Sequence, residues 1–165
     1  MKFIKRYTSI IFLTGLALFS CEKSITNPGN LVIETGTSFG ECLENCYQSI
    51  IFNTSSTDIE FVVKDYQTVD QTGIQRFNDS FTEKEHQEIL DTIDFEEFSS
   101  LNEDYGCPDC ADGGAEFIKI TDRITTGEPS HMVTFEYGKS VNGIEKLITL
   151  LRKKREELSN QYINQ

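Results

Sequence analysis

Two pairs of closely spaced cysteines are the residues whose types and spacing point most directly to chemistry. Cys42 and Cys46 have three residues between them, and Cys107 and Cys110 have two. Of the five cysteines, Cys21 lies at the end of an N-terminal segment that has the character of an export signal, and four remain. An even number in an exported chain is first interpreted as disulfides, so the sequence predicts that these four are oxidised. Three pairings are open. The compactness of each motif slightly favours local pairing, although the crossed pairings would close loops of about 65 residues and stabilise the fold more.

A thiol redox centre is an alternative interpretation of Cys107-Pro108-Asp109-Cys110. In thioredoxin-like proteins the same spacing opens a helix, whose N-terminus stabilises the thiolate. Here residues 111–114 lead into an expected strand, and no helix is expected to begin at the motif. The neighbouring Asp104, Asp109 and Asp112 would also oppose thiolate formation by repulsion. These features favour structural disulfides over a redox centre.

A metal site is the third interpretation of the cysteines. Four thiolates at these spacings could hold zinc, although in an exported chain they would have to escape oxidation. Cys107 and Cys110, together with Asp109, Asp112 or His131, could instead hold a softer metal. The leading expectation includes no metal and no cofactor.

The remaining chemistry-bearing residues do not form a recognisable catalytic set. Of the two histidines, His86 is expected to face solvent from a helix, and His131 is expected to have a structural role at the start of a strand. The chain lacks the Gly-x-Ser-x-Gly and His-Glu-x-x-His motifs, and no serine, histidine and acid suggest a triad. The sequence therefore predicts a protein that is not an enzyme.

One basic cluster, Arg152-Lys153-Lys154-Arg155, stands out in an acidic chain. It is expected near the end of the final helix, where positive charge complements the helix dipole. Contact with anionic lipid headgroups is the alternative.

The elements that must position these residues begin with strands. A short strand is expected at residues 31–33. Alternation over residues 46–52 and 59–63, around a turn at residues 53–57, predicts a first hairpin. A second hairpin is expected from residues 117–124 and 131–137, with Val133, Phe135 and Tyr137 facing the core.

Two helices complete the expected fold. Ser80 and Glu83 fit a capping box for the first helix. A looser turn over residues 95–101 and a polar loop over residues 102–114 follow. The second helix begins near Val141, and its apolar residues recur at helical spacing.

The order β-β-β-α-β-β-α predicts an α+β domain over residues 31–160. We expect an antiparallel sheet of two hairpins with two helices packed on one face.

The N-terminal segment predicts where in the cell the protein is located. Residues 1–20 have the basic start and the uncharged apolar run of a secretory signal. Leu18-Phe19-Ser20-Cys21 resembles the lipobox of bacterial lipoproteins, which implies a lipidated Cys21 followed by a tether to residue 30. Glu22 follows the anchor, and the absence of an aspartate there favours the outer membrane. The membrane leaflet stays open.

The net negative charge of the chain limits the kinds of molecule that it is expected to bind. The chain has 15 basic and 27 acidic residues, and three of the basic ones lie in the expected signal, so the mature charge is about −15. Nucleic acid, which requires basic surfaces, is therefore excluded as a partner. A solvated surface explains the acidity, and binding of cations or basic partners is the alternative.

Two segments carry a resemblance to known proteins. Residues 39–47, with the Cys42 motif, and residues 106–116, with the Cys107 motif, are similar to small exported lipoproteins of unknown function in Bacteroidetes-type bacteria. The first motif has Leu43-Glu44-Asn45 where those proteins usually carry an aromatic residue and glycine. The resemblance implies export and a compact α+β domain, and it brings no catalytic residues.

The leading hypothesis is a non-enzymatic lipoprotein, anchored to the membrane through Cys21, that binds an envelope partner or a ligand. The rival is a thiol redox or metal-handling protein that uses Cys107 and Cys110. An inhibitor of a secreted enzyme is a third hypothesis.

Overall fold

The computed structural model describes residues 29–65 and 73–164. The expected signal peptide, the expected lipidation site Cys21 and residues 22–28 of the expected tether lie outside this part. Within the described residues, no helix has both the length and the apolar character needed to cross a membrane.

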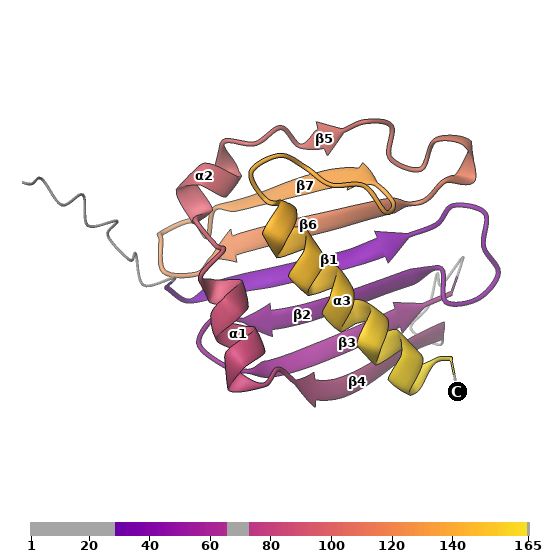
Figure 1. Ribbon diagram of the computed structural model, residues 1–165, viewed down its shortest axis with the longest axis horizontal. Helices are drawn as coiled ribbons and strands as arrows, with labels where there is room; N and C mark the ends of the chain where they lie inside the picture. Colours follow the sequence, from indigo (N-terminus) through magenta and orange to yellow (C-terminus); the bar gives the residue numbers. More distant parts are fainter. Residues whose placement is uncertain (1–28, 66–72, 165) are drawn as a thin grey trace, which may run out of the picture.

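In the described part of the chain, seven strands form one sheet in the order β4-β3-β2-β1-β6-β7-β5 (Figure 1). Neighbouring strands are antiparallel, except that β5 runs parallel to β7. The strands are β1 (Leu31–Ser38), β2 (Tyr47–Asn53), β3 (Asp58–Lys64), β4 (Ile74–Ser80), β5 (Asp104–Tyr105), β6 (Ala115–Asp122) and β7 (Ser130–Glu136).

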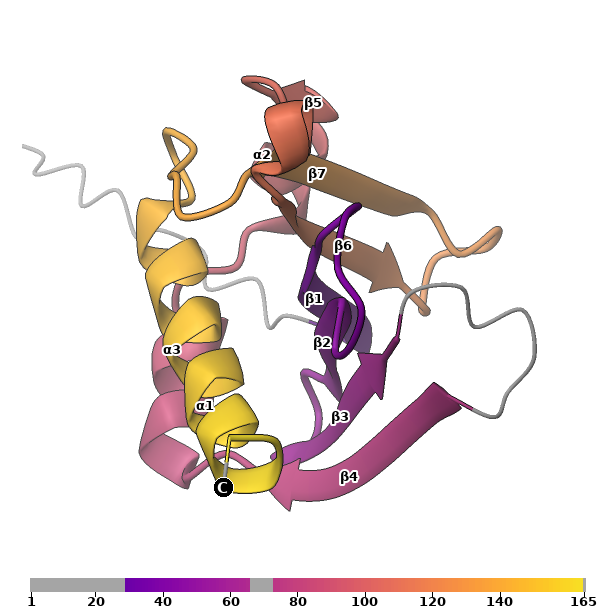
Figure 2. The ribbon, with the colours of Figure 1, turned by 90° about the vertical axis from the view of Figure 1, so that its right-hand side faces the viewer.

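Helices cover one face of this sheet. They are α1 (Glu83–Leu90), α2 (Phe95–Ser99) and α3 (Glu145–Tyr162). Figure 2 shows α1 and α3 on the same side, and in Figure 1 the long α3 crosses the strands diagonally. The prediction of an α+β domain with an antiparallel sheet is confirmed at this level. Its count of two hairpins and two helices is too small for the described residues, because β4, β5 and α2 were not predicted.

Strand alternation places the core between the sheet and the helices. Ile33, Ile50, Phe61 and Ile120 come from four strands and are fully buried. Leu147, Ile148 and Leu151 of α3 are also buried and belong to the same cluster. Burial of such apolar side chains is the main source of stability in a domain of this size.

Both predicted hairpins are present, as β2–β3 and β6–β7. β1 lies between them and pairs with β2 on one side and β6 on the other, so it joins the hairpins into one sheet. β1 continues to Ser38, beyond the predicted end at residue 33. It continues through Gly36, where a Cβ atom would lie 2.9 Å from the ring of Phe117.

The predicted capping box was wrong by two residues. Ser80 is the last residue of β4, and Thr82 is the N-cap of α1. The Glu85 amide donates to the Thr82 hydroxyl at 3.3 Å, and the Thr82 amide donates to the Glu85 carboxylate at 2.9 Å. Both pairs of residues have the capping-box spacing, and pairing of Ser80 with β3 makes it part of the sheet instead.

Strand β4 was missed because an edge strand can be polar. Its apolar inward residue Phe77 stacks on Tyr162 at 4.5 Å between ring centroids. Asp79, also inward by register, accepts hydrogen bonds from Tyr162 and Gln161 at the end of α3. A strand that meets a polar helix end does not show the usual alternation.

Two side-chain predictions were wrong. His86 was expected in solvent but is only 8% exposed, because its ring stacks beside Phe81. Tyr137 was expected in the core but is 47% exposed. β7 ends at Glu136, so the alternation that buries Val133 and Phe135 does not reach Tyr137.

Candidate functional site

The two cysteine motifs lie at the same end of the sheet (Figure 1). The loop after β1 and the loop before β6 start from paired residues, because Ser38 is opposite Ala115. The Gly40 amide donates to the Asp109 carboxylate at 3.3 Å and joins the two loops. We call this region the cysteine end, defined by residues 39–46 and 106–114.

Both cysteine pairs are disulfides in the structure. Cys42 is bonded to Cys46 and Cys107 to Cys110, each with a Cα–Cα distance of 5.4 Å. The expected disulfides are therefore present, with the local pairing. Each closes its own loop, whereas Gly40 and Asp109 connect one loop to the other.

The Cys107 motif lacks the helix that a thioredoxin-like site would use. Residues 110–112 form a single 3-10 turn, and β6 follows at Ala115. The Cys107 amide donates to the Glu136 carboxylate at 2.9 Å, which places another negative group beside the motif. The surroundings therefore do not favour a thiolate.

The alternative metal ligands are not brought together. His131 lies near the start of β7, where its ring packs edge-on against Phe98 at 5.6 Å. The Cys107 amide instead contacts Glu136, the last residue of the same strand. Among the described residues, no group of three or more histidine, cysteine, aspartate or glutamate side chains could hold a metal ion.

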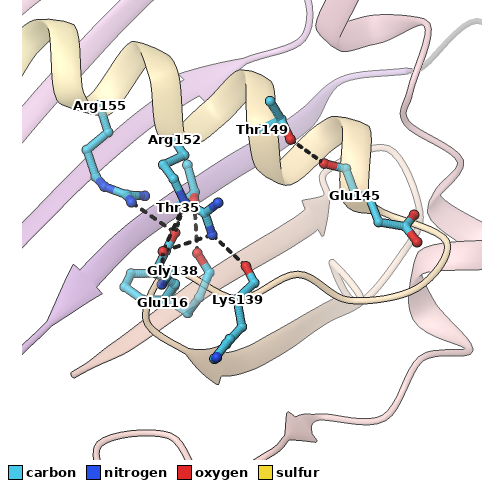
Figure 3. Close-up of polar contacts among 9 residues, drawn as sticks. Thr35, Glu116, Gly138, Lys139, Glu145, Thr149, Arg152 and Arg155 are labelled. Atoms are coloured by element: carbon cyan, nitrogen blue, oxygen red, sulfur yellow. Dashed lines mark hydrogen bonds and ion pairs between the residues drawn. The ribbon is translucent and has the colours of Figure 1, made fainter. Parts of the chain in front are cut away.

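A buried ion cluster lies next to the cysteine end (Figure 3). Its centre is Glu116 on β6, whose side chain is 2% exposed. Arg155 Nη2 lies 2.9 Å from Glu116 Oε2, and Arg152 Nη2 lies 3.0 Å from Glu116 Oε1. The Gly138 amide donates to the same carboxylate at 2.9 Å, and Arg152 also donates to the Lys139 carbonyl at 2.6 Å.

The cluster corrects the interpretation of the basic segment of α3. The segment lies in the middle of a helix that continues to Tyr162, so the helix-dipole explanation was wrong. Arg152 and Arg155 face Glu116, and Lys154 donates to the Ser80 carbonyl at 3.0 Å. Only Lys153 of these four is exposed, so the segment does not form the continuous basic surface that lipid headgroups would require.

A cavity of about 390 Å³ adjoins the ion cluster at the cysteine end. It lies between α3 and the ends of β1 and β2, with Tyr137 on a further side. Its lining combines two aromatic rings, hydroxyl and amide groups, one carboxylate and one guanidinium: Thr37, Phe39, Gln48, Tyr137, Arg155, Glu156, Ser159, Asn160 and Asn164. The rings of Phe39 and Tyr137 pack edge-on at 5.0 Å.

No model of a known protein family and no curated protein matches this chain. The resemblance to exported lipoproteins therefore stays a prediction.

The opposite face of the sheet carries a second group of interacting side chains. Tyr47 and Phe117 stack at 5.8 Å, and Lys64 Nζ lies 4.4 Å from the centroid of the Tyr47 ring. The Tyr47 hydroxyl donates to the Glu34 carboxylate at 2.8 Å. Burial, with a contribution from Glu34, raises the pKa of the Tyr47 phenol. These contacts satisfy one another and indicate a structural role.

The sequence analysis missed Glu116, although its pattern held a signal. Glu116, Ile118 and Ile120 occupy alternate positions of one strand, so the face that buries the isoleucines also buries the glutamate. Likewise, Arg155 falls between Leu151 and Leu158 on the apolar stripe of α3. A charged residue at an inward position on each of two elements predicts an internal ion pair.

Proposed function

We propose that this chain is a lipid-anchored extracytoplasmic protein whose single domain is a non-enzymatic binding module. The observation that carries the proposal is the presence of two short-range disulfides at one end of the sheet. Such bonds persist in oxidising compartments and are rare in the cytosol. The lipobox-like sequence Leu18–Cys21 supports an anchor at Cys21, with outer-membrane placement and a domain from residue 31.

The binding surface in this proposal is the cysteine end with its cavity. Loops held by disulfides keep their shape, which lowers the entropy lost when a ligand or an envelope protein binds. Leu43, inside the Cys42–Cys46 loop, is 91% exposed and adds an apolar contact point there. The same region supplies a concave site, the usual form of a small-molecule site.

The anchor is tested by labelling cells that express the full chain with radioactive palmitate and then separating membranes from soluble protein. We expect labelled protein in the membrane fraction. Cys21→Ser should abolish the label and release the chain from the membrane, whereas Cys42→Ser should keep the label. Undiminished label in Cys21→Ser would contradict the anchor.

A thiol redox protein is the second candidate, because Cys107 and Cys110 are both exposed and could meet a redox partner. The two functions differ in whether that disulfide exchanges electrons. The full chain, purified from the envelope, is alkylated without reduction, mapped by peptide analysis and assayed for metal. We expect Cys42, Cys46, Cys107 and Cys110 blocked in local pairs and no metal.

Activity separates the two candidates further. The wild-type chain is not expected to accelerate the reduction of insulin by dithiothreitol. Replacing Cys107 and Cys110 by serine should lower the melting temperature, as should the matched replacement of Cys42 and Cys46. Acceleration that depends on Cys107 and Cys110 alone would establish the redox function instead.

A further inference from the structure

The guanidinium of Arg155 is buried, and only some of its N–H groups donate to another residue. Its side chain is 4% exposed, and it lines the cavity. Within the described residues, its one recorded polar contact is the Nη2 bond to Glu116. A guanidinium carries five N–H donors. Among the described residues, no Arg155 nitrogen is a fully buried atom without a partner, so the remaining donors reach the open cavity, where they can donate to water or to a ligand.

The charges around the cavity favour a monoanion. Arg152 and Arg155 bring two positive charges to the single carboxylate of Glu116, which leaves one positive charge in excess in the ion cluster. The exposed Glu156 adds a negative charge to the lining that offsets part of this excess, and it disfavours a ligand with two negative charges more than a ligand with one. A carboxylate matches the planar donors of arginine and carries a single charge.

The rest of the lining suits an uncharged ligand body. Phe39 and Tyr137 offer ring surfaces at the cysteine end. Gln48, Asn160 and Asn164 offer amides, and Thr37 and Ser159 offer hydroxyls. Small-molecule sites combine apolar surfaces with a few polar groups in this way, and a cavity of about 390 Å³ has the volume for such a ligand.

We propose that this cavity binds a small monocarboxylate, with the ligand carboxylate on Arg155 and its body between the aromatic pair and the amides of Gln48, Asn160 and Asn164. The inference deepens the proposed binding function and rests on it. It does not depend on the lipid anchor.

The test is isothermal titration calorimetry on the full chain purified in a neutral detergent. The probes are butyrate, benzoate and glucuronate, each compared with its neutral amide, and inorganic phosphate. We expect at least one carboxylate to bind, and its amide to bind about 10- to 100-fold more weakly because the charge-assisted hydrogen bonds are lost. No binding by any carboxylate, equal binding of acid and amide, or preferred binding of phosphate would overturn the proposal.

Variants place the bound ligand in the cavity. Arg155→Gln should abolish binding, but it also removes a buried ion pair and could unfold the chain. Asn160→Trp provides the second test, because Asn160 is exposed and lines the cavity. It should weaken binding at least about tenfold through occlusion while the melting temperature stays close to that of the wild type.

Two further variants test whether the effect is specific to the cavity and whether the charge of its lining matters. Lys146→Trp is the matched control, since Lys146 is an exposed residue of α3 outside the lining, and its affinity should equal that of the wild type. Glu156→Gln should tighten binding about two- to threefold by removing the like charge. Unchanged affinity in Asn160→Trp would overturn the cavity as the site. A chain that keeps its palmitate label but binds no carboxylate would refute this inference and leave the anchored binding module standing.

Discussion

Glu116 is the one buried acidic residue in the described part of the chain. A buried carboxylate is tolerated only when its oxygens are well hydrogen-bonded. Here Arg152, Arg155 and the Gly138 amide all donate to it, and these donors come from α3 and from the turn after β7. The side chain therefore links α3 and the turn after β7 to β6.

Glu116→Gln is expected to lower the free energy of unfolding by about 3 kcal/mol, because two arginines lose their common buried partner. Equilibrium unfolding in urea measures this loss. Glu60→Gln is the control, since Glu60 pairs with Arg76 at 2.8 Å on an exposed surface and should change stability by less than about 1 kcal/mol. Equal losses in the two variants would contradict the role given to Glu116.

Gly36 allows close packing between β1 and its two neighbours. A Cβ atom there would lie 2.9 Å from the Phe117 ring and would also collide with the Gln48 carbonyl oxygen, which cannot move without disturbing β2. Gly36→Ala should therefore destabilise the domain by about 2 kcal/mol in thermal or urea unfolding. Ser38→Ala in the same strand should cost less than about 0.5 kcal/mol. An unchanged free energy of unfolding in Gly36→Ala would contradict this prediction, because it would mean that β1 and its neighbours accommodate the added methyl group at little cost.

At the level of elements, the start of α1 shows how local spacing can mislead. Ser80–Glu83 and Thr82–Glu85 both fit a capping box, and only the second pair forms one. We expect Thr82→Ala to reduce stability by about 1 kcal/mol, because an orphan amide of the helix loses its acceptor. Ser80→Ala should have little effect. Urea unfolding followed by circular dichroism measures the free energy of unfolding of both variants. A larger loss in Ser80→Ala than in Thr82→Ala would support Ser80 as the N-cap, as the sequence predicted.

Elements with a strong period were predictable, and elements defined by distant partners were not. β2, β3, β6, β7 and α3 have apolar residues at regular spacing, and all five are present near their predicted positions. β4 was not predicted because its partners, Tyr162 and Gln161, lie at the far end of the chain. No local pattern contains that information.

In the candidate site, too, the features that are local in sequence were predicted and those that join distant segments were not. The cysteine pairs are local in sequence and were predicted together with their favoured pairing. The cavity was not predicted, since its lining joins β1 and β2 to the end of α3. Arg155 was interpreted as part of one basic cluster with its three basic neighbours, residues 152–154, although it also falls on the apolar stripe of α3 between Leu151 and Leu158.

At the scale of the whole molecule, α3 connects the two halves of the sheet. Near its middle it binds Glu116 on β6, and near its end it binds Asp79 on β4 through Gln161 and Tyr162. Between these strands lie β3, β2 and β1. The helix therefore spans the sheet from β6 to β4, with polar contacts at its middle and at its C-terminal end and the buried Leu158 between them.

The contact at β4 predicts a pH dependence. Burial opposes ionisation of Asp79, but hydrogen bonds from the Ser80 amide, Tyr162 and Gln161, together with the charge of Lys154, lower its pKa below the ordinary value of 3.8. A carboxyl group whose pKa is lower in the folded chain stabilises that chain above its unfolded pKa. This stabilisation is lost as the pH falls through the folded pKa.

Asp79→Asn should therefore lower the free energy of unfolding by about 1 kcal/mol at pH 7, since a partly exposed charge-assisted contact is lost. The difference from the wild type should shrink as the pH falls from about 4 towards 2, because protonated Asp79 and asparagine are both neutral. Urea unfolding across this range measures the effect. Asp104→Asn, an exposed position in β5, is the control and should show a small difference at every pH. If the Asp79→Asn difference persisted undiminished at pH 2, the stabilisation would come from shape and not from the charge that joins α3 to the edge of the sheet.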